Sequence, residues 1–353
     1  MARSHLLFLG TYTRTGTSRG IYAVRLDGES GALSAPELVA ETPDPGWLTF
    51  SPDRQHLYAI HASPGQALAY RVDAPAGRLT ALSTLDPAVR AGAPCHLVVD
   101  ATGRTLLAAN YGDGYVAAIP IRADATLGPP NLVRHAGHSV HPTRQEKPHV
   151  HSVTLSPDNR FVLVADLGLD RIYSYALDPA TATLSAGPGS FFTSAPGAGP
   201  RHLKFGPDGT RVYVINELAN TIDTCAYDRP TGTMTRLDTV PTLPPGYLAP
   251  STAAEIRIHP NGRFVYGSNR GHDSIAVFAI APTTGALVPV ETVSTGGRNP
   301  RNFALSPDGR WLVCGHQDTP LLTVFRVDPA TGQLLRTPHT AEVPTCICVL
   351  FHD

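Results

Sequence analysis

The sequence repeats with a period of about 50 residues, and this repeat restricts the possible folds more than any other feature. Six segments consist of an apolar stretch, a turn rich in Pro, Asp, Asn and Gly, and a second apolar stretch; they begin at residues 48, 97, 153, 203, 256 and 303. Seven other segments, with two apolar stretches around a turn resembling Asp-Pro-x-Thr-Gly, alternate with them. Such turns between apolar runs are typical of β-hairpins. Four short strands in each repeat of this length predict a β-propeller.

The two ends of the chain supply the one hairpin that this count lacks. "LLFLGTYT" at residues 6–13 matches the second apolar stretch of the six segments, and "TCICVLF" at 345–351 matches the first. Pairing them completes a seventh unit and removes an open sheet edge. We therefore predict an all-β fold, a seven-bladed β-propeller with four-stranded blades, as a single domain over residues 1–353 whose ring is closed by the N- and C-terminal strands. A β-solenoid or two β-sandwiches would not explain why the ends complement each other.

The composition limits the classes of partner. Charged residues make up 16% of the chain, and 33 Pro and 32 Gly interrupt it throughout, which suits many short strands and turns. The formal net charge is −1 and no basic run is present, so we predict neither nucleic acid nor a membrane surface as partner. Small neutral or anionic ligands remain possible, and nothing in the sequence indicates the oligomeric state.

The cysteines and the N-terminal segment bear on the compartment. The five cysteines are scattered and lack metal-ligand spacing, which argues against a disulfide framework and for a reducing cytoplasm. The first apolar run is too short for a secretory leader, and no other stretch approaches the roughly 18 apolar residues of a membrane helix. We predict a cytoplasmic protein.

The repeat also predicts where polar side chains gather. In a propeller blade the first strand lines the central channel and the second returns antiparallel, so first-strand starts and second-strand ends share one face. The opposite face carries the turn residues, whose backbone requirements explain them. The first-strand starts are Trp47, Cys95, His96, His151, Ser152, Arg201, His202, Glu255, Arg301, Asn302 and Thr345. The second-strand ends are Thr11, Tyr12, His61, Asn110, Tyr111, Asp166, Asn216, Glu217, Asn269, Arg270, His316 and Gln317.

Two of these residues should face each other across one hairpin. Its turn centres on Gly209, which predicts that Arg201 and Glu217 lie opposite each other in the ladder. A cross-strand ion pair would explain them alone, but Arg270, Arg301 and His151 occupy related positions in other repeats. Converging polar groups in a concave place predict a ligand site.

The longest interval between repeats contains an insertion, residues 135–152, with five histidines. Histidines at this density can indicate a metal site, but their spacing matches no zinc pattern and the neighbouring Arg and Lys would repel a cation, so we predict no metal. We expect a loop that folds over the channel mouth and carries a catalytic imidazole. Cys95 and Cys314, near the same face, are interpreted as buried structural cysteines.

Several strings resemble the propeller-type lactonase family, which includes bacterial 6-phosphogluconolactonases and fungal carboxymuconate cycloisomerases. They are "LGTYT", "ANYGDG", "RQEKPHVHS", "VADLGLDRIY", "GAGPRHLKF", "VINEL", "AEIRIHPNGRFVYGSNRG" and "NPRNFALSPDG", and they span nearly the whole chain. The resemblance implies an active-site histidine at His151, arginines at Arg201 and Arg270, and a glutamate at Glu217. Residues predicted to bind substrate at the same face are His149, Arg301, Asn110, Gln317, His316 and His202. Relatives often carry Asn or Ala at the position of His316, and this difference bears on substrate shape.

These residue types suit a lactone. A carboxylate and an imidazole can act as general base and acid, and guanidiniums can stabilise a developing oxyanion, without a metal or another cofactor. We predict a lactonase that hydrolyses a small anionic, sugar-type lactone, 6-phosphogluconolactonase-like, with Glu217 favoured as base and His151 as acid. One alternative is a carboxymuconate cyclase-like isomerase that forms a lactone, in which arginines clamp substrate carboxylates. A second is a non-catalytic propeller that serves as an interaction scaffold. The chain has only two lysines, so arginines would have to bind most of a substrate phosphate.

Overall fold

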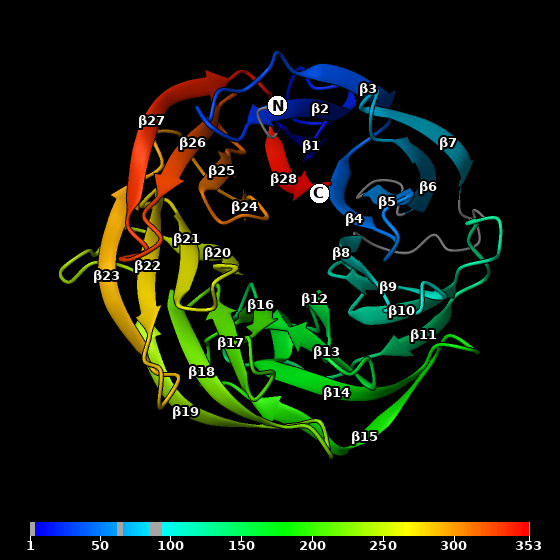
Figure 1. Ribbon diagram of the computed structural model, residues 1–353. Helices are drawn as coiled ribbons and strands as arrows, with labels where there is room; N and C mark the ends of the chain where they lie inside the picture. The colour runs from blue at the N-terminus through cyan, green and yellow to red at the C-terminus, as the bar shows by residue number, and fades with distance from the viewer. Residues whose placement is uncertain (1–3, 62–65, 85–93, 353) are drawn as a thin grey trace.

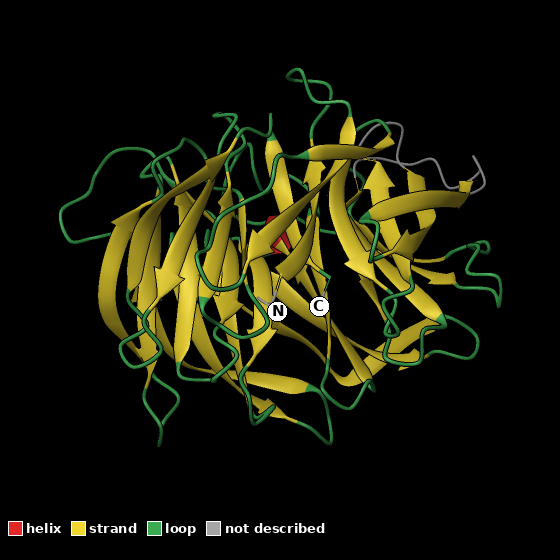
Figure 2. Cartoon of the chain, turned by 45° about the horizontal axis from the view of Figure 1, so that its top comes forward, coloured by secondary structure: helices red, strands yellow, loops and turns green. Residues whose placement is uncertain are grey.

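The computed structural model describes residues 4–61, 66–84 and 94–352. In this part of the chain, seven antiparallel sheets of four strands each surround a central channel (Figure 1). The strands form the wall of the ring, and the loops gather at its two faces (Figure 2). The seven-bladed propeller predicted from the repeat is confirmed.

Each blade runs outward from the channel in four strands. The innermost strands are β28 (Cys346–Phe351), β4 (Pro45–Phe50), β8 (Pro94–Val99), β12 (Val150–Leu155), β16 (Pro200–Phe205), β20 (Thr252–Ile258) and β24 (Asn302–Leu305). The second strands are β1 (Ser4–Thr11), β5 (His56–His61), β9 (Thr105–Asn110), β13 (Phe161–Asp166), β17 (Arg211–Asn216), β21 (Phe264–Arg270) and β25 (Trp311–Gly315). The third strands are β2 (Gly20–Asp27), β6 (Gln66–Asp73), β10 (Tyr115–Pro120), β14 (Arg171–Asp178), β18 (Thr221–Asp228), β22 (Ser274–Ile280) and β26 (Leu322–Val327). The outermost strands are β3 (Glu37–Glu41), β7 (Arg78–Thr84), β11 (Asn131–Arg134), β15 (Thr183–Thr193), β19 (Thr233–Pro241), β23 (Leu287–Ser294) and β27 (Leu334–Ala341).

The two ends of the chain close the ring as the sequence predicted. Strand β28 pairs antiparallel with β1, with Leu7 opposite Phe351 and Leu9 opposite Val349. This places the C-terminal strand innermost in a sheet whose other three strands are N-terminal (Figure 1). The inner edge of β1 is therefore covered by β28.

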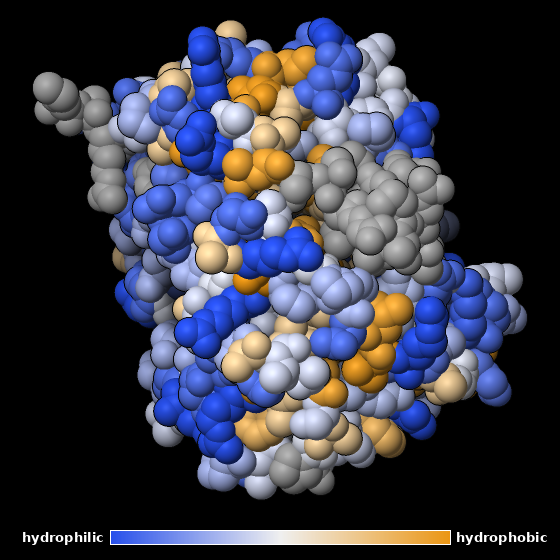
Figure 3. All heavy atoms as spheres, turned by 90° about the vertical axis from the view of Figure 1, so that its right-hand side faces the viewer, coloured by the Kyte–Doolittle hydropathy of each residue, from blue (hydrophilic) through white to orange (hydrophobic). Residues whose placement is uncertain are grey.

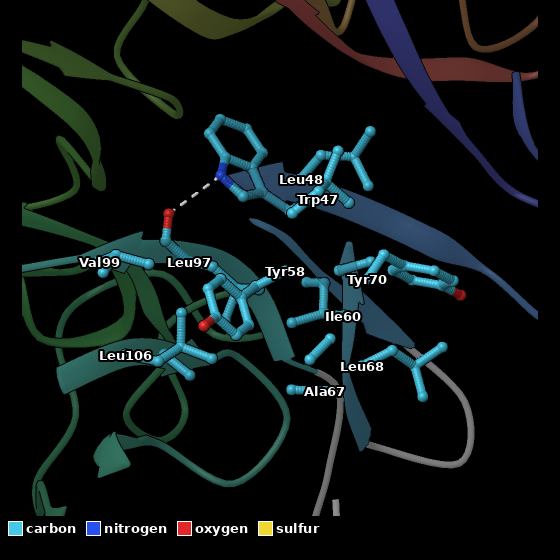
Figure 4. Packing of buried hydrophobic residues seen from close by; sticks show 14 of the residues in the cluster. Trp47, Leu48, Tyr58, Ile60, Ala67, Leu68, Tyr70, Leu97, Val99 and Leu106 are labelled. Carbon is cyan, nitrogen blue, oxygen red and sulfur yellow. Dashed lines mark hydrogen bonds between the residues drawn. The ribbon is translucent and has the colours of Figure 1, made fainter. Parts of the chain in front are cut away.

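The core lies between neighbouring blades. Strands β9 and β13 are buried along their whole length, because a neighbouring blade covers each of their two faces. Trp47 of β4 shows how blades are joined, since its indole nitrogen donates to the carbonyl of Leu97 in β8 at 3.1 Å (Figure 4). On the side of the ring that Figure 3 shows, apolar residues are scattered among polar ones. Within the described residues, no helix is long and apolar enough to span a membrane.

A β-bulge recurs where the innermost strands begin. The register with the second strand shifts around Gly46, Cys95, His151 and Arg201, each of which is the extra residue of its bulge. A bulge takes one residue out of the ladder and re-aims its side chain. The bulge residues of these four blades line one cavity at the end of the channel where the innermost strands begin, and we call this end the mouth.

The bulge also corrects one expectation. Arg201 and Glu217 were predicted to face each other in the ladder, but Pro200 pairs with Asn216 and His202 pairs with Ile215. Arg201 lies in the bulge, and Glu217 follows the end of β17. The predicted register was wrong by one residue from the turn onward, since Phe205 pairs with Val212, and the bulge shifts it by one residue more.

Candidate active site

Glu217 lies at the centre of a charged cluster at the mouth. Its backbone is fixed from two sides, since its N–H donates to the carbonyl of Gly199 at 2.7 Å and its carbonyl accepts from Ala253 at 3.1 Å. The Glu217 side chain is only 4% exposed. The carboxylate is therefore held at a defined place between two blades.

Three guanidiniums and an imidazole surround this carboxylate. Oε2 accepts a hydrogen bond from Nε of Arg201 at 2.9 Å and forms an ion pair with Nη2 of Arg270 at 3.0 Å, and Nε2 of His151 lies 3.8 Å away. Oε1 accepts from Nη2 of Arg144. We call these five residues the Glu217 cluster. The structure thus brings together all four residues predicted to be catalytic and adds Arg144.

A second bulge fixes two of these arginines. Strand β20 changes register between Ala253 and Ile256. The carbonyls freed there accept hydrogen bonds from the arginines, Ala254 from Nη1 of Arg201 at 2.6 Å and Ala253 from Nη2 of Arg270 at 3.0 Å. Each guanidinium therefore bridges Glu217 and the backbone of β20, which belongs to the next blade for Arg201 and to the same blade for Arg270.

The charges of the cluster set its protonation state. Burial alone would raise the pKa of Glu217, but the surrounding charges, Arg270 and Arg201 first, together outweigh burial and hold this pKa well below its usual value. Burial, together with Arg201, lowers the pKa of His151 well below that of an ordinary histidine. Burial and the guanidiniums of Arg270 and Arg301 lower the pKa of Arg201 to about 9. At neutral pH the cluster therefore combines an ionised carboxylate, a neutral imidazole and charged arginines.

A small cavity lies beside the cluster. Its volume is about 20 Å³, enough for one water molecule. It is lined by Tyr12, Gly46, Trp47, Pro94, Cys95, His151, Arg201, His202, Arg301 and Ile347. Cys95 is interpreted as structural, since burial raises the pKa of its thiol to about 12 and keeps it protonated.

The predicted substrate-binding residues divide into two groups. Arg301 and His202 line the cavity, and Arg301 also donates to Oε1 of Gln317 at 3.3 Å. The ring of His149 stacks on the ring of Tyr111, with ring centres 4.3 Å apart, and Nδ1 of His149 forms a hydrogen bond with the backbone carbonyl of Tyr111. These residues therefore border the cluster.

Asn110 and His316 do not join the cluster. The side-chain oxygen of Asn110 accepts from the backbone of Asp113, which braces the turn between β9 and β10. His316 is buried, and its Nδ1 bonds the carbonyl of Leu321 at 2.8 Å. Both side chains serve the turn after their own strand.

Arg144 is the member of the cluster that the sequence did not identify. It lies in residues 135–149, which we call the insertion loop, and it also reaches the hydroxyl of Tyr111 at 3.4 Å. The string "RQEKPHVHS" contains Arg144, but the repeat predicts positions only for residues of strands and turns, and Arg144 lies in an irregular loop. The loop was expected to contribute an imidazole, and it also contributes a guanidinium.

Asp170 anchors the insertion loop. Its buried carboxylate accepts four hydrogen bonds of 2.6–2.7 Å, two from the loop residues Ser139 and Gln145 and two from the backbone of Gly197 and Gly199. The latter pair precedes Arg201, so one side chain positions the two segments that carry Arg144 and Arg201.

We expect Asp170→Asn to lower the free energy of unfolding by about 3 kcal/mol, because the new amide directs an N–H at backbone N–H groups. Asp170 has a left-handed backbone, which Asn tolerates, so backbone strain is not added. Urea denaturation measures the change. Asp27→Asn, in an exposed turn, is the matched control and should change stability by less than about 0.5 kcal/mol. Equal effects of the two substitutions would contradict the anchoring role.

Comparisons with known proteins agree with this architecture. The family model described as "Lactonase, 7-bladed beta-propeller" matches residues 6–351. The 6-phosphogluconolactonase of Bacillus subtilis is 39% identical over 347 residues, covering 98% of this chain and 97% of that protein. The 6-phosphogluconolactonase of Pectobacterium carotovorum is 31% identical over 328 residues, covering 92% of each chain.

A solved structure shows the same similarity. The periplasmic gluconolactonase of Pseudomonas aeruginosa superposes with a TM-score of 0.93 at 35% identity, covering 99% of both chains. This relative is periplasmic, so the cytoplasmic location stays a prediction from the sequence.

Proposed function

Because the chain belongs to the seven-bladed β-propeller lactonase family, we propose that it hydrolyses a small anionic sugar lactone at the Glu217 cluster. The observation that carries this proposal is one ionised carboxylate held by three guanidiniums beside a neutral imidazole. An acid–base pair next to fixed positive charge is what ester hydrolysis requires.

The proposed reaction uses side chains of the cluster alone. A water molecule attacks the lactone carbonyl while Glu217 or His151 takes its proton, and the ring C–O bond then breaks as the proton returns to the leaving oxygen. Glu217 is favoured as the base because it is ionised. His151, neutral and within reach, can pass the proton to the leaving group.

Arg270 is proposed to stabilise the oxyanion. Its Nε–H is buried and has no hydrogen-bond partner among the described residues. A buried, unused charged donor beside the acid–base pair is suited to the negative charge that develops on the carbonyl oxygen. Arg201 can assist, because it is equally fixed by Glu217 and Ala254.

The direct test is base consumption by the purified protein in a pH-stat. Glucono-1,5-lactone and its 6-phosphate are offered separately, and spontaneous hydrolysis is subtracted. Turnover of either lactone supports the proposal. If neither is consumed while a carboxymuconate loses its diene absorbance, the lactone-forming alternative replaces it. A protein inactive on both would contradict an enzymatic role for this cluster.

The pH dependence should reflect the lowered pKa values. The pKa values of Glu217 and His151 both lie well below the usual values for these residue types, so both groups stay deprotonated between pH 7.5 and 5.5. We therefore expect kcat/KM to change less than about twofold over this interval. An ordinary histidine base would lose about nine tenths of its activity over this interval. Initial rates in buffers of constant ionic strength measure this, and an acid limb near pH 6.5 would contradict the buried cluster as the source of the base.

A further inference from the structure

The two oxygens of Glu217 are held in different ways. Oε2 is shared by Arg201 and Arg270, which are 3% and 12% exposed and also bond backbone carbonyls of β20. Oε1 has a single charged partner among the described residues, Arg144. A charged donor directed at Oε1 occupies one of its two lone pairs and stabilises its negative charge, which makes this oxygen a weaker base.

Arg144 is the least anchored of the three arginines. Its side chain is 35% exposed, and its other side-chain contact is a long one, to the hydroxyl of Tyr111. Its backbone is nevertheless well placed, because the adjacent Gln145 is buried and donates to Leu167 and Asp170. The guanidinium can therefore turn away from Glu217 without movement of the insertion loop.

We propose that Arg144 is a substrate-operated gate: it leaves Oε1 of Glu217 to bind a second anionic group of the substrate, and thereby frees Oε1 to act as the base. This inference rests on the proposed hydrolysis. The substrate class it names is a lactone that bears a phosphate or a carboxylate away from the reacting ester.

Charge complementarity favours this exchange. In the resting site Arg144 shares one carboxylate with two other guanidiniums, whereas a phosphate offers up to two negative charges and a bidentate fit. Departure of Arg144 also removes one of the positive charges that lower the pKa of Glu217, so the freed carboxylate becomes a stronger base. An anionic substrate would thus activate the site as it binds.

The test compares Arg144→Gln with the wild type on two lactones, glucono-1,5-lactone and its 6-phosphate. For the phosphorylated lactone we expect kcat/KM to fall about 10- to 100-fold, because a charge-assisted contact is lost. For the uncharged lactone we expect kcat/KM to rise, because Oε1 is no longer occupied. Arg144→Lys should retain part of the activity on the phosphorylated lactone. An equal fall on both lactones, as a purely structural role predicts, would overturn the gate.

Lys147→Gln is the matched control, since it removes one charge from the same loop at an exposed site, where the ammonium donates to the carbonyl of Gly112. It should leave both rates unchanged, and a loss like that of Arg144→Gln would overturn a specific role for Arg144.

Calorimetric titration with 6-phosphogluconate and gluconate gives a readout that does not need turnover. Arg144→Gln should weaken the binding of 6-phosphogluconate at least tenfold more than the binding of gluconate, even if hydrolysis itself is not found. Equal weakening would reject the gate while leaving a hydrolytic function intact.

Discussion

Glu217→Gln is expected to lower kcat/KM for the lactone by about 10³-fold or more while the propeller stays folded. The amide has nearly the shape of the carboxylate, but it cannot take a proton from water. It also removes the negative charge that fixes Arg201, Arg270 and Arg144, so the oxyanion donors lose their arrangement. Initial-rate kinetics measure the loss.

The same substitution leaves buried guanidiniums without a counter-charge, which should lower the free energy of unfolding by about 3 kcal/mol. Circular dichroism and thermal melting separate this effect from the catalytic one. Glu41→Gln is the control, because Glu41 pairs with Arg19 at an exposed site and should affect neither activity nor stability. Full activity of Glu217→Gln would show that the reaction takes place elsewhere.

Removal of residues 346–353 should abolish cooperative folding. These residues include β28, whose apolar side chains Cys346, Ile347, Cys348, Val349 and Phe351 are buried. Burial of each contributes about 1.5–3 kcal/mol, so the loss is on the order of 10 kcal/mol, comparable to the whole stability of a domain. The exposed edge of β1 would also favour aggregation. Thermal unfolding followed by circular dichroism measures the result.

A circular permutant separates loss of the strand from displacement of the termini. Here the native ends are joined by a short linker and new ends are opened in the exposed loop at residues 243–249. This chain keeps β28 paired with β1 and should unfold cooperatively. Cooperative unfolding of the truncated chain would contradict closure of the ring by the terminal strands.

The fold could be predicted from the sequence because the repeat is expressed in local features. Turn residues recur at fixed offsets between apolar runs, and each blade needs the same alternation of strands. The ring closure followed from the complementary ends at 6–13 and 345–351. Glu217, Arg201, Arg270 and His151 could be placed at one mouth because their positions within the repeat determine the face.

The remaining features depend on irregular geometry. The bulge at Arg201 shifts the ladder by a residue, and no local sequence pattern marked it. Arg144 reaches Glu217 from a loop whose path is set by Asp170, a contact distant in sequence. Substrate binding by Asn110 stays a prediction from its position at a strand end, and the structure adds that its side chain braces the following turn.

The most direct measurement is a crystal structure of the protein with 6-phosphogluconate, the product of the proposed reaction. We expect the carboxylate formed from the lactone carbonyl to contact Arg270 and Arg201 beside Glu217, with the phosphate bound by Arg144 turned away from Oε1. A product molecule held on the opposite face, in the groove of about 520 Å³ lined by Asp53, Arg104 and Arg122, with the Glu217 cluster unchanged, would contradict hydrolysis at the mouth of the channel.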